Sequence, residues 1–263
     1  ILSKVPQDIK FPAVLKAENL SGGRGMKYIK DIKNLKESVN HFYLLGISKF
    51  ILSEYVEGVE ATFTVLRLGD TFIRLPSSYK KETTENMIHP DAKVKISGIF
   101  KEFDEYFEFV EKVMREYKIF GFFSLQGVLL KDSEKYSVVF LEAAPRMTGS
   151  TPIMEASLIG FNIFETISLW MKEQKIEFAY TKRLALQYSS YIHDGKETVE
   201  KLNENSWVIE AKYEDLGKMP YSEDNKDRIR ISFFIENQDQ LQNHLSVISF
   251  VCNNKNYVKE VND

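Results

Sequence analysis

Two pairs of alternating segments joined by short turns constrain the fold of this chain more than any other feature. Residues 60–67 alternate between apolar and polar side chains and turn at Gly69–Asp70 into residues 72–75. Residues 123–130 and 136–142 flank a polar turn in the same way. Strands of period two that follow one another across a short turn pair as antiparallel hairpins. The sequence therefore predicts two β-hairpins.

The other expected elements mix strands and helices, and the region beyond residue 180 reads as a small α+β lobe. Residues 77–98 are polar, have no period and contain a proline and a glycine, so we interpret them as a long surface loop, with Lys80 and Lys81 as a solvated pair of charges. Short apolar runs predict strands at 11–15, 28–29, 50–54, 184–192, 207–213 and 228–235, and helical spacing predicts helices at 31–46, 103–117, 162–172 and 238–251.

Composition excludes several classes of function. The 263 residues suffice for one large domain or two lobes, and a net charge of −3 without a basic block argues against a nucleic-acid partner. A run of about 18 apolar residues and a secretory signal are both missing, so we expect no membrane span. The single Cys252 fits a reducing compartment, and we expect a cytoplasmic protein. A start at Ile1 reads as the C-terminal portion of something longer.

A glycine-rich segment follows the first expected strand. Gly22, Gly23 and Gly25 would let backbone N–H groups approach an anion closely, because no Cβ obstructs them. Lys16, just beyond that strand, could reach a phosphate as a point charge. The spacings of the P-loop and of the dinucleotide fingerprint are both absent, so a flexible turn is the alternative interpretation.

A second group of polar positions lies in residues 51–65. An extended backbone at Glu54, Tyr55 and Val56 could supply the acceptor and the donor that adenine requires, and Glu60 could accept hydrogen bonds from ribose hydroxyls. The alternative is a solvated strand edge, since glutamate is mostly exposed.

A third group lies in the second hairpin. If that hairpin mirrors about residue 134, Gln126 and Glu142 fall opposite one another on the same face. Two such oxygen donors can hold Mg²⁺, which completes its octahedron with water and phosphate oxygens, and Mn²⁺ would also suit them. Arg146 could brace a carboxylate or phosphoryl group, and His89, in the long loop, is a candidate substrate-side group. The alternative is a cross-strand polar pair beside a surface arginine.

The three groups occur in an order that resembles the ATP-grasp superfamily of carboxylate-amine and carboxylate-thiol ligases, including carbamoyl phosphate synthase and L-amino acid ligases. The resemblance covers residues 11 to about 172, from FPAVLKAENLSGGRGM through ILSEYVEGVEATFTVL to FSLQGVLL and VFLEAAPRMTGS. It implies an α+β fold of two subdomains gripping ATP, followed by a small C-terminal α+β lobe. The implied domains are 1–57, the glycine-loop subdomain; 58–180, the metal-site subdomain; and 181–263, the C-terminal lobe.

The resemblance also implies roles for individual residues. Lys16 would contact the α-phosphate and the adenine side of ATP, and Arg146 would steady an acyl phosphate. Gln126 and Glu142 would hold Mg²⁺, and Glu60 would bind the ribose. The mobile loop over the β- and γ-phosphates would comprise Ser21, Gly22, Gly23, Gly25 and Met26, and the adenine-reading hinge would comprise Glu54, Tyr55 and Val56.

The implied reaction is attack of a small carboxylate on the γ-phosphoryl group of ATP, followed by opening of the acyl phosphate by an amine. Ala144 departs from the pattern, because the family usually has a metal-binding asparagine there, and Gln126 is neutral where many relatives carry an acid. The family's N-terminal domain, of roughly 90 to 120 residues, is also missing. Three interpretations stay open: a ligase that acts alone or as a homodimer, an ATP-binding module or pseudoenzyme, and a carbamoyl phosphate synthase-like enzyme completed by a separate chain.

Overall fold

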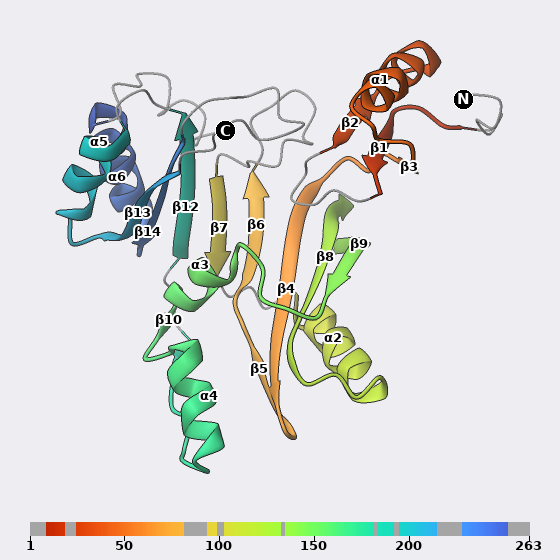
Figure 1. Ribbon diagram of the computed structural model, residues 1–263. Helices are drawn as coiled ribbons and strands as arrows, with labels where there is room; N and C mark the ends of the chain where they lie inside the picture. The colour runs from red at the N-terminus through yellow and green to blue at the C-terminus, as the bar shows by residue number, and fades with distance from the viewer. Residues whose placement is uncertain are drawn as a thin grey trace.

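The computed structural model describes residues 9–18, 25–81, 94–98, 103–132, 135–180, 184–191, 195–214 and 228–251. Their strands form three sheets (Figure 1). The small sheet has the order β2-β1-β3, and a second pair joins β10 to β11. The large, nine-stranded sheet has the order β13-β14-β12-β7-β6-β4-β8-β9, with β5 paired to β4.

The elements have the following bounds. The strands are β1 (Ala13–Ala17), β2 (Met26–Ile29), β3 (Phe50–Glu54), β4 (Val59–Leu68), β5 (Thr71–Arg74), β6 (Ser77–Lys81), β7 (Val94–Gly98), β8 (Gly121–Asp132), β9 (Lys135–Ala144), β10 (Leu158–Ile159), β11 (Ala179–Tyr180), β12 (Leu184–Tyr191), β13 (Val208–Glu214) and β14 (Arg228–Ile235). The helices are α1 (Ile32–Leu44), α2 (Asp104–Glu116), α3 (Thr151–Ala156), α4 (Ile163–Met171), α5 (Gly195–Asn203) and α6 (Gln238–Val251). Within the described residues, every helix is too short or too polar to cross a membrane.

The small sheet buries one face against α1. Ala13 and Leu15 of β1 pack with Leu35 and Phe42 of the helix, because alternate residues of a strand share a face. The side chain of Asp31 accepts a hydrogen bond from the N–H of Asn34 at 2.8 Å and so caps the helix, as the sequence predicts. Figure 1 shows α1 on the side of the small sheet that is turned away from the large one.

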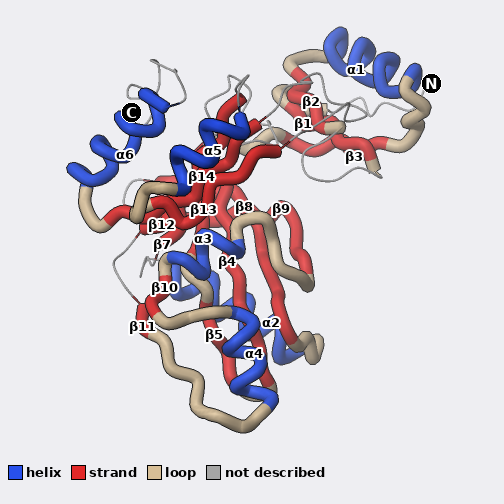
Figure 2. The backbone as a smooth tube through the Cα atoms, turned by 60° about the vertical axis from the view of Figure 1, so that its left-hand side comes forward, coloured by secondary structure: helices blue, strands red, loops and turns tan. Residues whose placement is uncertain are grey.

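The large sheet is covered differently on its two faces. Phe63 of β4 packs with Phe107 and Val110 of α2. Leu66, an even-numbered residue of the same strand, packs with Met154 of α3. Successive side chains point to opposite faces of a sheet, so α2 and α3 lie on opposite sides of it (Figure 2). The polar residues of the candidate site lie on the face that carries α3.

The strands beyond residue 180 extend the large sheet. β12 pairs with β7 through Leu186 and Ile96, and α5 and α6 pack on β14 through Leu202 and Ile248. The strands of the predicted C-terminal lobe are thus continuous with those of the predicted metal-site subdomain. The division into 1–57, 58–180 and 181–263 stays a prediction.

The interpretation of residues 77–98 as a loop is wrong at both of its ends, while residues 82–93 lie outside the described part of the chain. β6 and β7 lie within that range and pair in antiparallel fashion, from Ser77 opposite Gly98 to Lys81 opposite Val94. The side chains that these strands bury include Ser77, Ser78 and Ser97. Small hydroxyl side chains give no hydrophobic signal, which explains the error. The sequence also did not predict α3, α5, β10 or β11.

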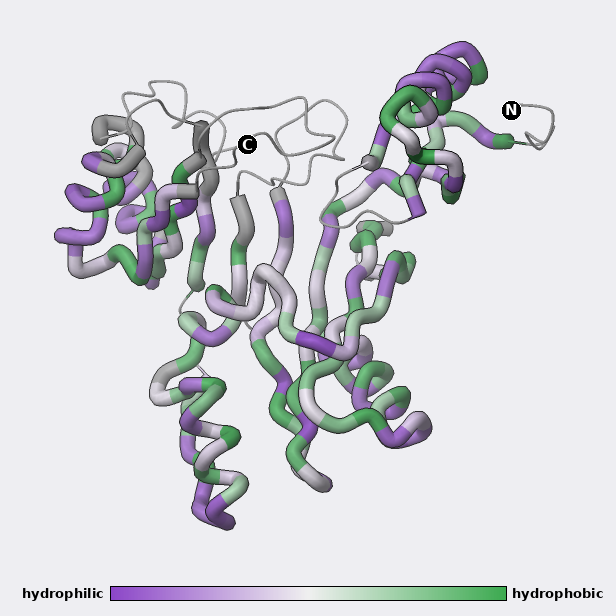
Figure 3. Tube along the Cα trace, in the orientation of Figure 1, coloured by the Kyte–Doolittle hydropathy of each residue, from purple (hydrophilic) through white to green (hydrophobic). Residues whose placement is uncertain are grey.

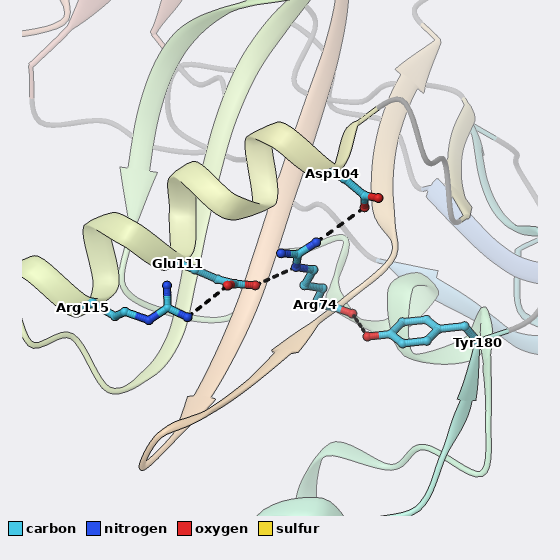
Figure 4. A network of polar contacts seen from close by, with 5 residues as sticks. All are labelled: Arg74, Asp104, Glu111, Arg115 and Tyr180. Carbon is cyan, nitrogen blue, oxygen red and sulfur yellow. Dashed lines mark hydrogen bonds and ion pairs between the residues drawn. The ribbon is translucent and has the colours of Figure 1, made fainter.

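A polar network fastens β5 to its neighbours (Figure 4). The Nε of Arg74 donates to Glu111 of α2 at 2.6 Å, and its Nη1 lies 3.5 Å from Asp104. The hydroxyl of Tyr180 in β11 donates to the carbonyl of Arg74 at 2.9 Å. The hydrogen bond with Glu111 raises the pKa of Arg74 above its ordinary value. Arg115 also lies 3.3 Å from the carboxylate of Glu111, which therefore joins two arginines.

Candidate functional site

The segment after β3 presents backbone groups along an unpaired edge. β3 is the edge strand of the small sheet, and the N–H of Tyr55 donates to the carbonyl of Pro12 at 3.2 Å. In an antiparallel pair, hydrogen-bonded and non-hydrogen-bonded positions alternate. The backbone groups of Glu54 and Val56, on either side of Tyr55, therefore face away from β1. Of the three predicted hinge residues, Glu54 and Val56 can read an adenine edge, while Tyr55 anchors the strand.

Gly58 holds this segment close to the large sheet. A Cβ at that position would collide with the carbonyl oxygen of Leu129 and lie 2.6 Å from a methyl group of Val128. Only glycine allows the chain to approach β8 this closely. The passage from the edge of β3 into β4 is therefore fixed by direct backbone contact with β8.

Lys16 lies on the face of the small sheet opposite α1. Its neighbours Leu15 and Ala17 are buried, and Lys16 itself is half-buried. It pairs with Met26 on one side and with Ile51 on the other. Gly25 has a φ of +70° and its carbonyl accepts from the N–H of Ala17 at 2.9 Å, so it closes the turn into β2.

The predicted phosphate loop is described only in part. Ser21, Gly22 and Gly23 lie outside the described residues, and so does His89. Gly25 and Met26 are the described members of that loop. The structure thus brings Lys16 and Met26 together on adjacent strands.

Glu60 is paired with a lysine that the sequence interpretation passed over. The two residues lie directly opposite each other on β4 and β6, and Nζ of Lys80 donates to Oε1 of Glu60. Their side chains are 22 % exposed for Lys80 and 23 % for Glu60. The interpretation of Lys80 and Lys81 as a solvated charge pair is therefore wrong for Lys80. The run SSYK does not alternate between apolar and polar residues, so the sequence carries no signal for this strand or for its partner.

Gln126 and Glu142 lie directly opposite one another on β8 and β9, as the sequence predicts. The ladder is irregular at this point, because Gly127 pairs with Phe140 and Leu141 is the extra residue of a bulge. Phe140 stacks on Phe109 of α2 with ring centroids 5.2 Å apart. The bulge allows Phe140 to face α2 while Glu142, two residues later, faces the side of the sheet that carries α3.

One row of opposed residues crosses this face of the sheet. From β9 to β7 it runs through Glu142, Gln126, Thr62, Ser78 and Ser97. Within the described residues, no group of three or more His, Cys, Asp or Glu side chains could hold a metal ion. The pair Gln126 and Glu142 fits Mg²⁺ instead, since that ion uses one or two protein carboxylates and takes its other ligands from water and phosphates.

Ala144 and Arg146 follow Glu142 at the end of β9. Ala144 lies opposite Ser124 and is buried. The hydroxyl of Ser124 lies 2.9 Å from that of Thr64 and donates to the carbonyl of Arg146 at 3.3 Å. The Arg146 guanidinium is exposed and donates to the carbonyl of Met147 at 2.9 Å. Its backbone is thus held while its side chain stays accessible to a ligand.

No family model matches the chain. The carbamoyl-phosphate synthase of Methanobrevibacter smithii is 22 % identical over 235 residues, which cover 84 % of this chain and 60 % of that protein. The structure superposes with a TM-score of 0.64 on an L-amino acid ligase from Bacillus licheniformis, at 16 % identity over 95 % of this chain and 65 % of that one.

The biotin carboxylase domain of Hydrogenobacter thermophilus 2-oxoglutarate carboxylase, solved with MgADP and bicarbonate, superposes with a TM-score of 0.60. That likeness has 15 % identity and covers 96 % of this chain and 63 % of the other. The chain therefore spans less than two thirds of the length of each of these proteins. At these levels of sequence identity, the similarity shows a shared fold. It agrees with the order of the motifs along the sequence, and the chain has the ATP-grasp fold.

Proposed function

We propose that this chain binds Mg-ATP and is the nucleotide-binding part of an ATP-dependent ligase. The ligase would activate a small carboxylate as an acyl phosphate and join it to an amine, such as an amino acid. The observation that carries the proposal is the opposed pair Gln126 and Glu142, which lies in a row of polar residues on one face of the large sheet, with Glu142 exposed. Solved proteins of the same fold bind MgADP or ligate amino acids.

The nucleotide would lie between the two sheets. Adenine would meet the outward backbone groups of Glu54 and Val56, and the ribose would meet Glu60. Lys16 and the loop that includes Gly25 and Met26 would contact the phosphates. Such positions are supported by the edge of β3 and by the placement of Lys16 on the face away from α1.

Gln126 and Glu142 would hold Mg²⁺, which would neutralise charge on the transferred phosphoryl group. The protein's own contribution would be positioning and electrostatic stabilisation rather than covalent chemistry. Arg146 has the exposed guanidinium that this role needs, and it could bind the carboxylate and then the acyl phosphate in a bidentate manner.

One observation favours a second function, an ATP-binding module without turnover. Ala144 stands two residues after Glu142, opposite Ser124, where a metal-binding side chain would complete the site. A third, a carbamoyl phosphate synthase-like enzyme, is favoured by the similarity to the carbamoyl-phosphate synthase of Methanobrevibacter smithii. The cytoplasm stays the predicted compartment.

A screen for ADP release separates these functions. The chain is incubated with Mg-ATP, a panel of amino acids and bicarbonate as acids, and ammonium or amino acids as nucleophiles. The ligase predicts substrate-dependent ADP release that is lost in Lys16→Ala and Glu142→Ala and kept in Lys33→Ala and Glu116→Ala, which change exposed residues of α1 and α2. Turnover that survives in both site variants would refute the ligase, and nucleotide binding without ADP release from any mixture would favour the module.

A further inference from the structure

Lys80 and Glu60 form an ion pair between the neighbouring strands β6 and β4. Lys80 Nζ donates to Glu60 Oε1, and both side chains are largely removed from solvent. An exposed ion pair contributes little to stability, but a partly buried carboxylate that is held by a lysine keeps one orientation. The geometry of Glu60 is therefore set by a residue on the neighbouring strand.

The pair stands where the hinge segment enters the large sheet. Glu60 is the second residue of β4 and follows Gly58, whose backbone lies against β8. Thr62, the next residue on the same face, lies opposite Gln126. Figure 3 shows hydrophilic colour at the upper end of β6. Lys80 of that strand lies opposite Glu60, near the start of β4. Lys80 therefore lies on the same polar face of the sheet as Gln126 and Glu142, the proposed ligands of Mg²⁺.

We infer that Lys80 is a positioning residue for nucleotide recognition, acting through Glu60. This inference rests on the proposed function. Lys80 occupies Oε1 of Glu60 and leaves Oε2 to accept the vicinal hydroxyls of the ribose. Lys80 does not itself touch the nucleotide. Its effect is selectivity for a ribonucleotide over a nucleotide that lacks both hydroxyls.

Calorimetry with two nucleotides tests this role. ADP and 2′,3′-dideoxy-ADP are titrated, with Mg²⁺, into the unaltered chain and into Lys80→Met, Lys80→Arg and Glu60→Gln. A hydrogen bond to a charged group contributes about 1.5–3 kcal/mol, so the unaltered chain should favour ADP roughly 10- to 100-fold. Lys80→Met should lower that ratio to about the value for Glu60→Gln, and Lys80→Arg should restore most of it. Lys112→Met is the matched control, because it changes an exposed lysine of α2, the helix that covers the other face of the sheet.

The ratio of the affinities for ADP and 2′,3′-dideoxy-ADP separates a positioning role from general damage to the fold. A merely structural defect would weaken the binding of both nucleotides alike and leave their ratio unchanged. An unchanged ratio in Lys80→Met would overturn the inference while leaving the proposed function intact. Should Lys80→Met fail to fold, Lys80→Gln replaces it, since it keeps an amide donor without the charge; a lowered ratio supports the inference and an unchanged one overturns it. If the unaltered chain binds neither nucleotide, the proposed function itself fails.

Discussion

Gln126 and Glu142 lie opposite each other although the ladder between β8 and β9 is interrupted beside them. Gly127 pairs with Phe140, so Leu141 is accommodated as a bulge before Glu142 meets Gln126. A regular strand would place Phe140 and Glu142 on one face. The bulge separates them, so that Phe140 reaches α2 and Glu142 stays with the polar row.

The charge of this pair should set the Mg²⁺ requirement for nucleotide binding. Charged oxygen ligands bind hard cations such as Mg²⁺ more tightly than neutral ones. Gln126→Glu adds a carboxylate beside Glu142, so half-maximal ADP binding should need several-fold less Mg²⁺. Glu142→Gln removes the carboxylate, so half-maximal binding should need at least roughly tenfold more. A titration of Mg²⁺ at fixed ADP, followed by the fluorescence of a labelled nucleotide, measures both. Equal requirements in the two variants would contradict a metal site at this pair.

Gly58 should be indispensable for the approach of the hinge to β8. A methyl group there meets the backbone of Leu129, so Gly58→Ala should lower the free energy of unfolding by about 1–3 kcal/mol and weaken nucleotide binding. Gly149→Ala is the control, because a Cβ at Gly149 has nothing within 4 Å. Denaturant unfolding and calorimetry on both variants check the prediction, and equal behaviour would contradict it.

Arg74 should contribute measurably to stability through Glu111. Arg74→Leu leaves a buried carboxylate with Arg115 as its remaining partner, so it should destabilise the fold by about 2 kcal/mol. Thermal unfolding measures the effect. Lys201→Met, which breaks an exposed pair with Glu197 within α5, should leave the midpoint unchanged. A similar midpoint for both variants would show that the network in Figure 4 is not stabilising.

His244 should make stability depend on pH in a definite direction. Burial lowers the pKa of His244, whose ring stacks on Trp207 with centroids 4.1 Å apart. Below the ordinary value of about 6.5, the unfolded chain binds the proton more readily, so stability falls as pH decreases through that value. His244→Phe keeps a ring on Trp207 and cannot titrate. Its melting temperature should drop less than that of the unaltered chain between about pH 7.5 and 5.5.

The sequence was most informative where apolar residues alternate. The hairpins of β4 with β5 and of β8 with β9 were predicted, as was the opposition of Gln126 and Glu142. That opposition was obtained by mirroring the hairpin about residue 134, whereas the turn pairs Asp132 with Lys135 and the bulge supplies the difference. A bulge has no sequence signal of its own here, so the prediction was confirmed without its physical basis being foreseen.

The sequence was least informative where the buried side chains are polar. Ser78 and Ser97 are buried in β6 and β7, and hydroxyl side chains in such positions look like a loop. Lys80 was missed for the same reason, since its partner Glu60 is known only once β6 is placed beside β4. The ATP-grasp fold followed from the order of three motifs, while the roles of Lys16, Glu60 and Arg146 stay predictions.

Calorimetric titration of ADP with and without Mg²⁺, into the unaltered chain, Glu142→Ala and the exposed control Glu116→Ala, tests the central claim most directly. The account predicts Mg²⁺-dependent binding by the unaltered chain and the control, and loss of that dependence in Glu142→Ala. Binding that is equally strong without Mg²⁺, or unchanged in Glu142→Ala, would contradict a nucleotide and metal site at Gln126 and Glu142.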